Sequence, residues 1–245
     1  MKSEIIFDNG KHKWIAIGRD PDKNQNVIDT NEYLIIDSDT KGMILDPGGI
    51  EIFASVLVET SKYILPENIE KMLVSHQDPD IASSLALWVN MNETMEVYCS
   101  WLWAGFISHF SMGTDFSFST LPDEGKDIYL GTSKLTFVPA HYCHSSGNFS
   151  LYDHTANILF SGDVGAALVP DSDYSLIVED FEKHIQYMEG FHKRWMPSKT
   201  ALHAWVNRVR LLKPDMICPQ HGSIFKGNDV DKFLNWLESI EVGIW

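Results

Sequence analysis

The stretch KMLVSHQDPD, residues 71–80, joins a short apolar run to a group of metal-binding side chains. Residues 71–74 are typical of a short buried strand, because strands covered on both faces are apolar along most of their length. His76, Asp78 and Asp80 follow at alternate positions. Along an extended loop, residues two apart point the same way, so these side chains can face a common site. The stretch therefore predicts a strand that ends at a metal centre.

Three later segments repeat this arrangement, since each follows a strand-like run. They are HYCHSSGN at 141–148, SGD at 161–163 and PQHG at 219–222. Taken alone, each of these segments is more often an ordinary turn than a binding site. Their combination in one chain is the stronger signal, because loops that leave neighbouring strands converge at one edge of a sheet. The four segments together predict one site at such an edge.

The residue types in these loops suit two metal ions. Two divalent cations held close together repel each other, so their site needs several carboxylates and a bridging group. Asp163, on a Ser-Gly-Asp turn, is well placed to bridge, and His144 and His221 would complete one ion each. Three histidines with three aspartates favour iron or manganese, although ligand type alone leaves zinc open.

The remaining chain alternates between strand-like and helix-like segments. Apolar runs bounded by turn residues predict strands at 4–7, 14–17, 33–37, 43–46, 71–74, 96–99, 135–138, 149–152, 158–160 and 216–218. Longer periodic segments predict helices at 50–63, 81–90, 102–110, 174–196, 200–212 and 230–240. Interspersed strands and helices indicate a layered α/β sandwich. Because no repeat or linker interrupts the pattern, we expect a single domain over residues 1–245.

Composition excludes several classes of partner. The 245 residues carry 34 acidic and 19 basic side chains, a formal charge of −15, with no local cluster of Lys and Arg. Such a chain repels nucleic acid and anionic membrane surfaces. We find no apolar run long enough to span a bilayer and no signal peptide. The 3 widely spaced cysteines suit a reducing compartment. We therefore expect a cytoplasmic protein with no nucleic-acid or membrane partner.

These segments carry a family resemblance. The chain resembles the metallo-β-lactamase superfamily and, within it, the diiron domain of flavodiiron proteins. The resemblance runs from NEYLI at 31–35 and the LDPG turn at 45–48 to CPQHG at 218–222. The superfamily motif HxHxDH stands here as HQDPDI at 76–81, with a carboxylate at the second histidine position. That change marks the flavodiiron branch. The resemblance as a whole implies an αββα sandwich with a diiron site at one sheet edge.

The resemblance also implies a role for each metal-binding residue. The first iron would be held by His76, Asp78 and His144, the second by Asp80 and His221, with Asp163 bridging both. It implies no catalytic residue beyond this metal site. His141 matches the family pattern less well than His144, and we expect there either a histidine that supports a ligand or an ordinary loop histidine.

The chain departs from flavodiiron proteins after its last ligand loop. No Gly/Thr/Ser-rich phosphate loop follows, so no built-in FMN is expected. Repeated reduction of O₂ would then need an outside electron donor. The chain is similar to the stand-alone oxygen-binding diiron proteins of this layout. We therefore expect a protein whose two irons, passing between Fe²⁺ and Fe³⁺, bind O₂ and report it as a sensor.

Two other functions stay open at this point. One is an O₂ or NO reductase that takes electrons from a separate flavoprotein or rubredoxin. The other is a dizinc hydrolase, in which the metals would activate water. A protein partner for signalling or electron transfer, and a homodimer like those of flavodiiron relatives, are equally open.

Several aromatic and histidine residues lack a motif. We expect His12, His154 and His184 on the surface. The aromatic residues of the segment 189–205 could support the site or form a partner surface, and those of Trp101–Phe110 could line an approach to the metals. We expect both groups to belong to the core instead, because apolar rings on a helical face are usually buried. Cys143 is expected to be a buried thiol and not a ligand.

Ile81 replaces a histidine of the superfamily motif and cannot coordinate a metal. Ile81→His should therefore change O₂ binding or release, measured as the visible spectrum and the binding rates of the iron-loaded protein. An unchanged spectrum with unchanged rates would show that this position is silent.

Overall fold

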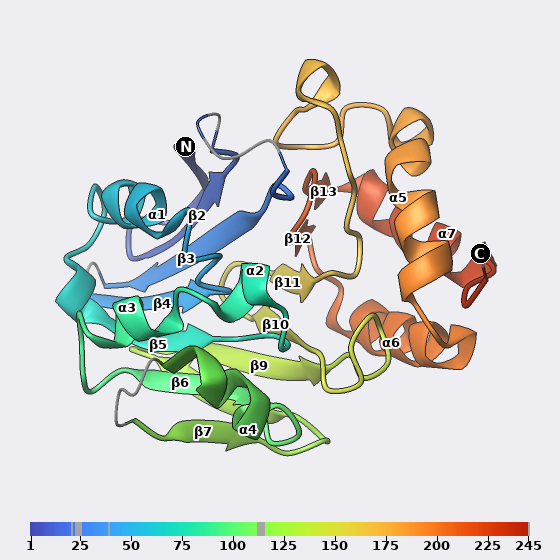
Figure 1. The fold of residues 1–245 in the computed structure, drawn as a ribbon. Coiled ribbons are helices and arrows are strands. Elements are labelled where there is room, and N and C mark those ends of the chain that lie inside the picture. Colours follow the sequence, from blue (N-terminus) through green and yellow to red (C-terminus); the bar gives the residue numbers. More distant parts are fainter. Residues whose placement is uncertain (21, 23–25, 39, 112–115, 245) are drawn as a thin grey trace.

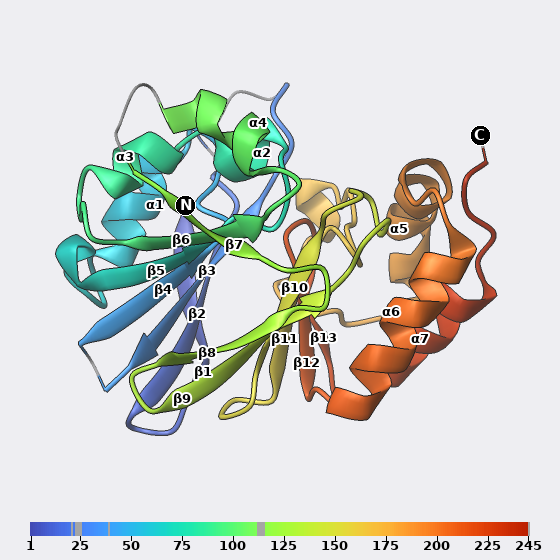
Figure 2. The ribbon, with the colours of Figure 1, turned by 90° about the horizontal axis from the view of Figure 1, so that it is seen from below.

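The computed structural model describes residues 1–20, 22, 26–38, 40–111 and 116–244. Two sheets face each other, and helices cover the outer face of each (Figures 1 and 2). The expected αββα order of layers is confirmed.

The first sheet holds seven strands in sequence order. They are β1 (Lys2–Asp8), β2 (His12–Gly18), β3 (Asn31–Asp37), β4 (Lys41–Leu45), β5 (Ile69–Leu73), β6 (Glu96–Ser100) and β7 (Phe118–Leu121). Strands β1 to β4 pair antiparallel, whereas β4 to β7 pair parallel. Parallel neighbours need a crossover, and helices supply it. These are α1 (Phe53–Thr60), α2 (Pro79–Ala82), α3 (Leu85–Val89) and α4 (Ala104–Ile107).

The second sheet has six strands in the order β13-β12-β11-β10-β9-β8. They are β8 (Lys126–Leu130), β9 (Ser133–Pro139), β10 (Phe149–Asp153), β11 (Ile158–Gly162), β12 (Met216–Pro219) and β13 (Phe225–Lys226). Only β11 and β12 pair parallel among these strands. Their crossover contains α5 (Phe181–Trp195) and α6 (Lys199–Leu212), and α7 (Asn228–Ser239) follows β13. Figure 2 shows α5, α6 and α7 together on the outer side of this sheet.

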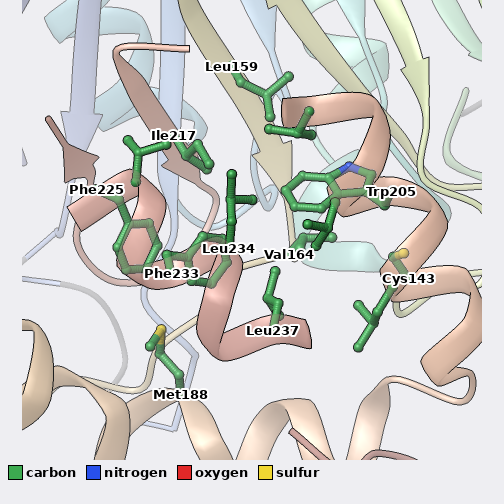
Figure 3. Close-up of a cluster of buried hydrophobic side chains, with 14 of the residues drawn as sticks. Cys143, Leu159, Val164, Met188, Trp205, Ile217, Phe225, Phe233, Leu234 and Leu237 are labelled. Atoms are coloured by element: carbon green, nitrogen blue, oxygen red, sulfur yellow. The ribbon is translucent and has the colours of Figure 1, made fainter. Parts of the chain in front are cut away.

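Three apolar layers hold the sandwich together. One lies between the two sheets and includes Tyr33 and Phe160, whose rings are 5.6 Å apart. The second lies between the first sheet and α1 to α4. The third packs α5, α6 and α7 on the second sheet, and Figure 3 shows Trp205, Leu234 and Leu237 within it. Burial of these apolar side chains is the main favourable term in folding.

One edge of the sandwich is joined across the two sheets by backbone hydrogen bonds. The amide of Phe149, in the second sheet, donates at 3.2 Å to the carbonyl of Ser75, two residues after the end of β5. The amide of Asn31, in the first sheet, donates to the carbonyl of Gln220 at 2.6 Å, directly after β12. These bonds fix the loops that follow β5 and β12 relative to each other.

The expected elements match the structure except in a few places. The expected helix at 81–90 is divided into α2 and α3. The expected helix at 174–196 starts only at Phe181, because Asp180 caps it by accepting from the amide of Lys183 at 3.2 Å. Ile177 instead forms a bridge with Ile224, which makes the preceding segment extended. Strands β7, β8 and β13 were not predicted. In the described part of the chain, no helix is both long and apolar enough to cross a membrane.

Two of the three histidines expected on the surface are buried, which corrects that expectation. His12, on β2, is 1% exposed. Its Nε2 lies 2.5 Å from Asp153 Oδ2, on β10, and its Nδ1 lies 3.2 Å from Asp37 Oδ1. His184 packs its ring against Phe225 at 5.7 Å. Only His154 is exposed as expected.

The His12–Asp153 pair ties the two sheets together. Burial lowers the pKa of His12, but hydrogen bonds and charges from Asp153 and Asp37 outweigh burial and raise it above 6.5. A raised pKa in the folded state means that the pair contributes its full stability below pH 6.5. That contribution is lost as the pH rises through the raised pKa.

His12→Ala should lower the free energy of unfolding by about 3 kcal/mol, because it leaves two buried carboxylates unpaired. Urea unfolding at several pH values measures this loss, which should shrink as the pH rises. His154→Ala is the matched control, with an expected change within about 0.5 kcal/mol. Equal free energies of unfolding for His12→Ala and His154→Ala would contradict the role of His12.

Candidate metal centre

Each expected ligand sits where a loop leaves the end of a strand. His76 and Asp78 follow β5, and Asp80 lies in the first turn of α2. His144 is in the loop between β9 and β10, Asp163 directly follows β11, and His221 follows β12. Parallel pairing of β4 with β5 and of β11 with β12 directs these loops to the same edge. The structure therefore brings together all six residues that the sequence predicts.

One oxygen of Asp163 faces a first group of side chains. Asp163 Oδ2 lies 3.7 Å from His76 Nε2 and 3.4 Å from His144 Nε2. Asp78 Oδ2 lies 2.9 Å from His144 Nε2 and 3.6 Å from His76 Nε2. Ligand atoms of His76, His144 and Asp163 all lie within 4.8 Å of one another, which is close enough to hold one ion.

The other oxygen of Asp163 faces a second group. Its Oδ1 lies 3.5 Å from His221 Nε2, which in turn lies 3.5 Å from Asp80 Oδ2. The two carboxylate oxygens thus point to two separate sets of donors. This division is the one that a bridging carboxylate between two ions requires.

The donor set fits metal ions. His76 Nε2 and Asp163 Oδ1 are buried and have no hydrogen-bond partner among the described residues. Such orphaned atoms are costly, and a cation at this place would satisfy both. Asp78 and Asp80 keep part of their side chains exposed, at 31% and 23%. The site is therefore open to solvent on their side.

Within the described residues, only histidines form ion pairs with the three carboxylates of the site. No Lys or Arg of the described chain is ion-paired with Asp78, Asp80 or Asp163. Burial lowers the pKa of His76, but the charges of Asp163 and Asp78 raise it to about 9. Burial also raises the pKa of Asp80. Without metal, a proton on His76 offsets part of the negative charge.

Two of the three histidines are oriented by a hydrogen bond at Nδ1. Ser75 Oγ donates to Asp46 Oδ2 at 2.7 Å and so accepts from His76 Nδ1 at 2.9 Å. His221 Nδ1 donates to the carbonyl of Asp29 at 2.6 Å. In both rings this leaves the Nε2 lone pair free for a metal, as is usual for ligating histidines.

Asp46 supports the candidate site, and sequence reasoning missed it. It lies in the LDPG turn, but its motif position does not reveal that it orients His76 through Ser75. Its backbone has φ +48, a left-handed conformation that Asp and Asn tolerate better than most residues. Burial raises the pKa of Asp46 to about 7.

A chain of side chains also holds Asp78. Trp103 Nε1 donates to Ser145 Oγ at 2.9 Å, and Ser145 Oγ donates to Gln77 Oε1 at 2.8 Å. Gln77 Nε2 then donates to Asp78 Oδ1 at 2.9 Å. Trp103 therefore supports the candidate site. The expectation that the nearby aromatic residues belong to the core is wrong for Trp101 and Phe106, which are 56% and 62% exposed. It is confirmed for Trp103 and Phe110, which are partly buried and pack against the core under the first sheet's helices.

Three residues close in sequence to the candidate ligands are placed outside the two donor groups. Ile81 is fully buried in the apolar layer between the first sheet and α1 to α4. His141 Nε2 donates to the carbonyl of Asp123 at 2.9 Å, as a loop histidine would. Cys143 lies in the apolar layer under α6, where burial raises its pKa to about 12. Both His141 and Cys143 agree with expectation.

Comparison with known proteins identifies the family. A model of the ODP family beta lactamases matches residues 28–222. The chain belongs to this family. It is 39% identical to the apo state of the chemotaxis sensor ODP from T. denticola, with a TM-score of 0.86, covering 99% of this chain and 96% of that one. A structure described as a peroxy diiron species of the chemotaxis sensor ODP is 40% identical, with a TM-score of 0.87 and coverage of 98% and 96%.

More distant relatives share the fold. A flavo di-iron protein from Thermotoga maritima is 22% identical, with a TM-score of 0.80, over 97% of this chain and 60% of that one. An uncharacterised protein of Methanocaldococcus jannaschii is 26% identical over 212 residues, 84% of this chain and 52% of the relative. The chain spans about half the length of the curated relatives it matches. Its fold is that of metallo-β-lactamase-type diiron domains.

Asp46→Asn should weaken Fe²⁺ binding by about 10- to 100-fold, as loss of a partner that orients a ligand typically does. The amide keeps the size of the side chain and tolerates the same backbone, so the change acts on Ser75 and His76. Affinity is measured without oxygen by competition with a coloured chelator. Asp171→Asn, at an exposed carboxylate that pairs with Arg19, is the control. Full affinity in Asp46→Asn would contradict this role.

Proposed function

We propose that this chain binds two iron ions at the sheet edge and binds O₂ there, as an oxygen sensor. The observation that carries the proposal is the division of Asp163, whose two oxygens face two separate donor groups. The similarity to the chemotaxis sensor ODP, at about 40% identity over nearly the whole of both chains, supports it. The proposed ligands are His76, Asp78 and His144 for one ion, Asp80 and His221 for the other, and Asp163 for both.

The chain's own residues would orient the ligands and balance their charge. When bound, the irons supply open coordination positions and the electrons for O₂. Asp78, Asp80 and Asp163 reduce the net charge of the site and favour the more oxidised ions. Ser75 and the carbonyl of Asp29 hold His76 and His221 in the ring orientation that presents Nε2. The partly exposed side of Asp78 and Asp80 leaves a route for a small ligand.

Turnover distinguishes the proposed sensor from a reductase. A sensor binds O₂ once and keeps its new state, whereas a reductase consumes O₂ as long as electrons arrive. The proposal also holds that the protein signals through a protein partner. O₂ is the proposed ligand, with NO as an alternative small molecule.

O₂ uptake by protein loaded with Fe²⁺ under anaerobic conditions tests the proposal, with the visible spectrum recorded alongside. We expect uptake to stop near one O₂ per iron pair, with a lasting new absorption band. Asp163→Ala, which removes the shared ligand, should lose at least one ion and this stoichiometric uptake.

Each other outcome has a defined meaning. Uptake that continues when a reductant is added would contradict the sensor and favour a reductase. No uptake and no new band would contradict the iron site, and a dizinc hydrolase would become the better hypothesis. Two ions retained in Asp163→Ala would contradict its bridging role.

A further inference from the structure

His144 is held differently from the other two candidate histidine ligands. His76 and His221 each make a hydrogen bond at Nδ1. The Nδ1 of His144 is buried and has no hydrogen-bond partner among the described residues. Ligating histidines are almost always oriented by such a bond. Its Nε2, the atom that would face a metal, contacts Asp78 Oδ2 at 2.9 Å, so the rest of the ring must be held by contacts other than hydrogen bonds.

Aromatic rings surround His144 instead. Its ring centroid lies 5.8 Å from that of Phe191 and 5.4 Å from that of Trp195, both on α5. Phe191 and Trp195 stack on each other, with centroids 6.1 Å apart and planes 22° apart. The ring of His76 meets His144 edge-on from another side at 4.9 Å. The rings of Phe191 and Trp195 meet His144 at tilted angles of 31° and 52°. The stacked Phe191–Trp195 pair and the edge-on contact of His76 are favourable beyond the area they bury.

The loop that carries His144 does not fix the ring by itself. His144 has φ +74, and Tyr142 has φ +60, so two non-glycine residues adopt the left-handed conformation. Each such residue costs about 1 kcal/mol or more and persists only when its surroundings hold it. Asn148 supports the loop backbone by donating to the carbonyl of Cys143 at 2.9 Å. That bond holds the backbone and does not reach the imidazole, which contacts Asp78 Oδ2 through Nε2 at 2.9 Å and otherwise meets aromatic neighbours.

Helix α5 is well suited to hold those neighbours. Phe191 is partly buried and packs against the apolar layer under α5, α6 and α7. The adjacent His192 is fully buried, and its Nε2 accepts from the amide of Gly165 at 3.0 Å, two residues after Asp163. In Figures 1 and 2 the loop between β9 and β10 extends toward α5. One helix thus contacts both the His144 ring and the loop of Asp163.

We propose that the stacked Phe191–Trp195 pair positions His144 for metal binding, in place of the missing hydrogen bond. Trp195 is then a positioning residue that acts through His144. The inference rests on the proposed function, because it concerns how one ligand of that metal site is held. Trp195 is 55% exposed, so the hold on this ligand depends on a ring at the protein surface.

Three variants test the proposal by anaerobic Fe²⁺ binding in competition with a chelator. Trp195→Ala should weaken binding by about 10-fold, the lower end of the effect of losing a partner that orients a ligand. Trp195→Phe should restore most of the affinity, since a planar ring remains. Trp101→Ala is the matched control, because Trp101 is 56% exposed and donates to Asp123 at 2.8 Å. It should bind Fe²⁺ like the unmodified protein.

A second measurement uses the metal-free protein. The ring-proton signals of His144 in a ¹H–¹³C NMR spectrum should shift in Trp195→Ala, because the ring current of the indole is lost. They should not move in Trp101→Ala. Thermal unfolding should be the same in all variants, since both tryptophans are more than half exposed.

The outcomes distinguish this inference from the proposed function. Full Fe²⁺ affinity in Trp195→Ala, or equal losses in Trp195→Ala and Trp195→Phe, would overturn the positioning role. If the unmodified protein bound no Fe²⁺, the proposed function would fail. The NMR comparison would then still test whether Trp195 holds His144. Unshifted His144 ring-proton signals in Trp195→Ala would overturn the positioning role.

Discussion

Negative charge gathered at one buried edge is the constraint on which this structure depends. Asp163 is nearly inaccessible, Asp78 and Asp80 lie beside it, and in the described chain only histidines are ion-paired with the three. Carboxylates this close repel one another unless positive charge is supplied. Protons on His76 can supply some of it, and metal ions would supply more. The polar loops, the Ser75 and Asp29 anchors and the orphaned donor atoms all suit this requirement.

The sandwich meets this constraint by drawing the candidate ligands from both of its sheets. The second sheet contributes Asp163 and His221 from its single parallel pair, and the first contributes the loop after β5. Backbone bonds from Asn31 and Phe149 join the two sheets at that edge. Away from it, the buried pair of His12 and Asp153 joins them again through side chains. The site is thus held by two rigid layers whose relative position is fixed in more than one place.

Sequence reasoning brought the four loops of the candidate ligands to one site because each joins a recognisable strand to a compact polar motif. It could not find Asp46 or the carbonyl of Asp29 as anchors, since only the folded backbone brings them to His76 and His221. It placed Trp195 in the core, because a ring on a helical face looks the same whether it meets other apolar residues or a ligand. His12 was misplaced for a related reason: its partner Asp153 lies in the other sheet, far along the chain.

The spread of the four loops along the chain has a consequence for biosynthesis. Domains emerge from the ribosome N-terminal end first, so the strands of the first sheet and the His76 loop are made well before His221. Until that last loop is made, the second donor group lacks His221, and only the carboxylate of Asp80 is present on that side of Asp163. Complete metal loading would therefore come at the end of folding. Two metal ions in the candidate site would mark a chain whose two sheets have already packed together.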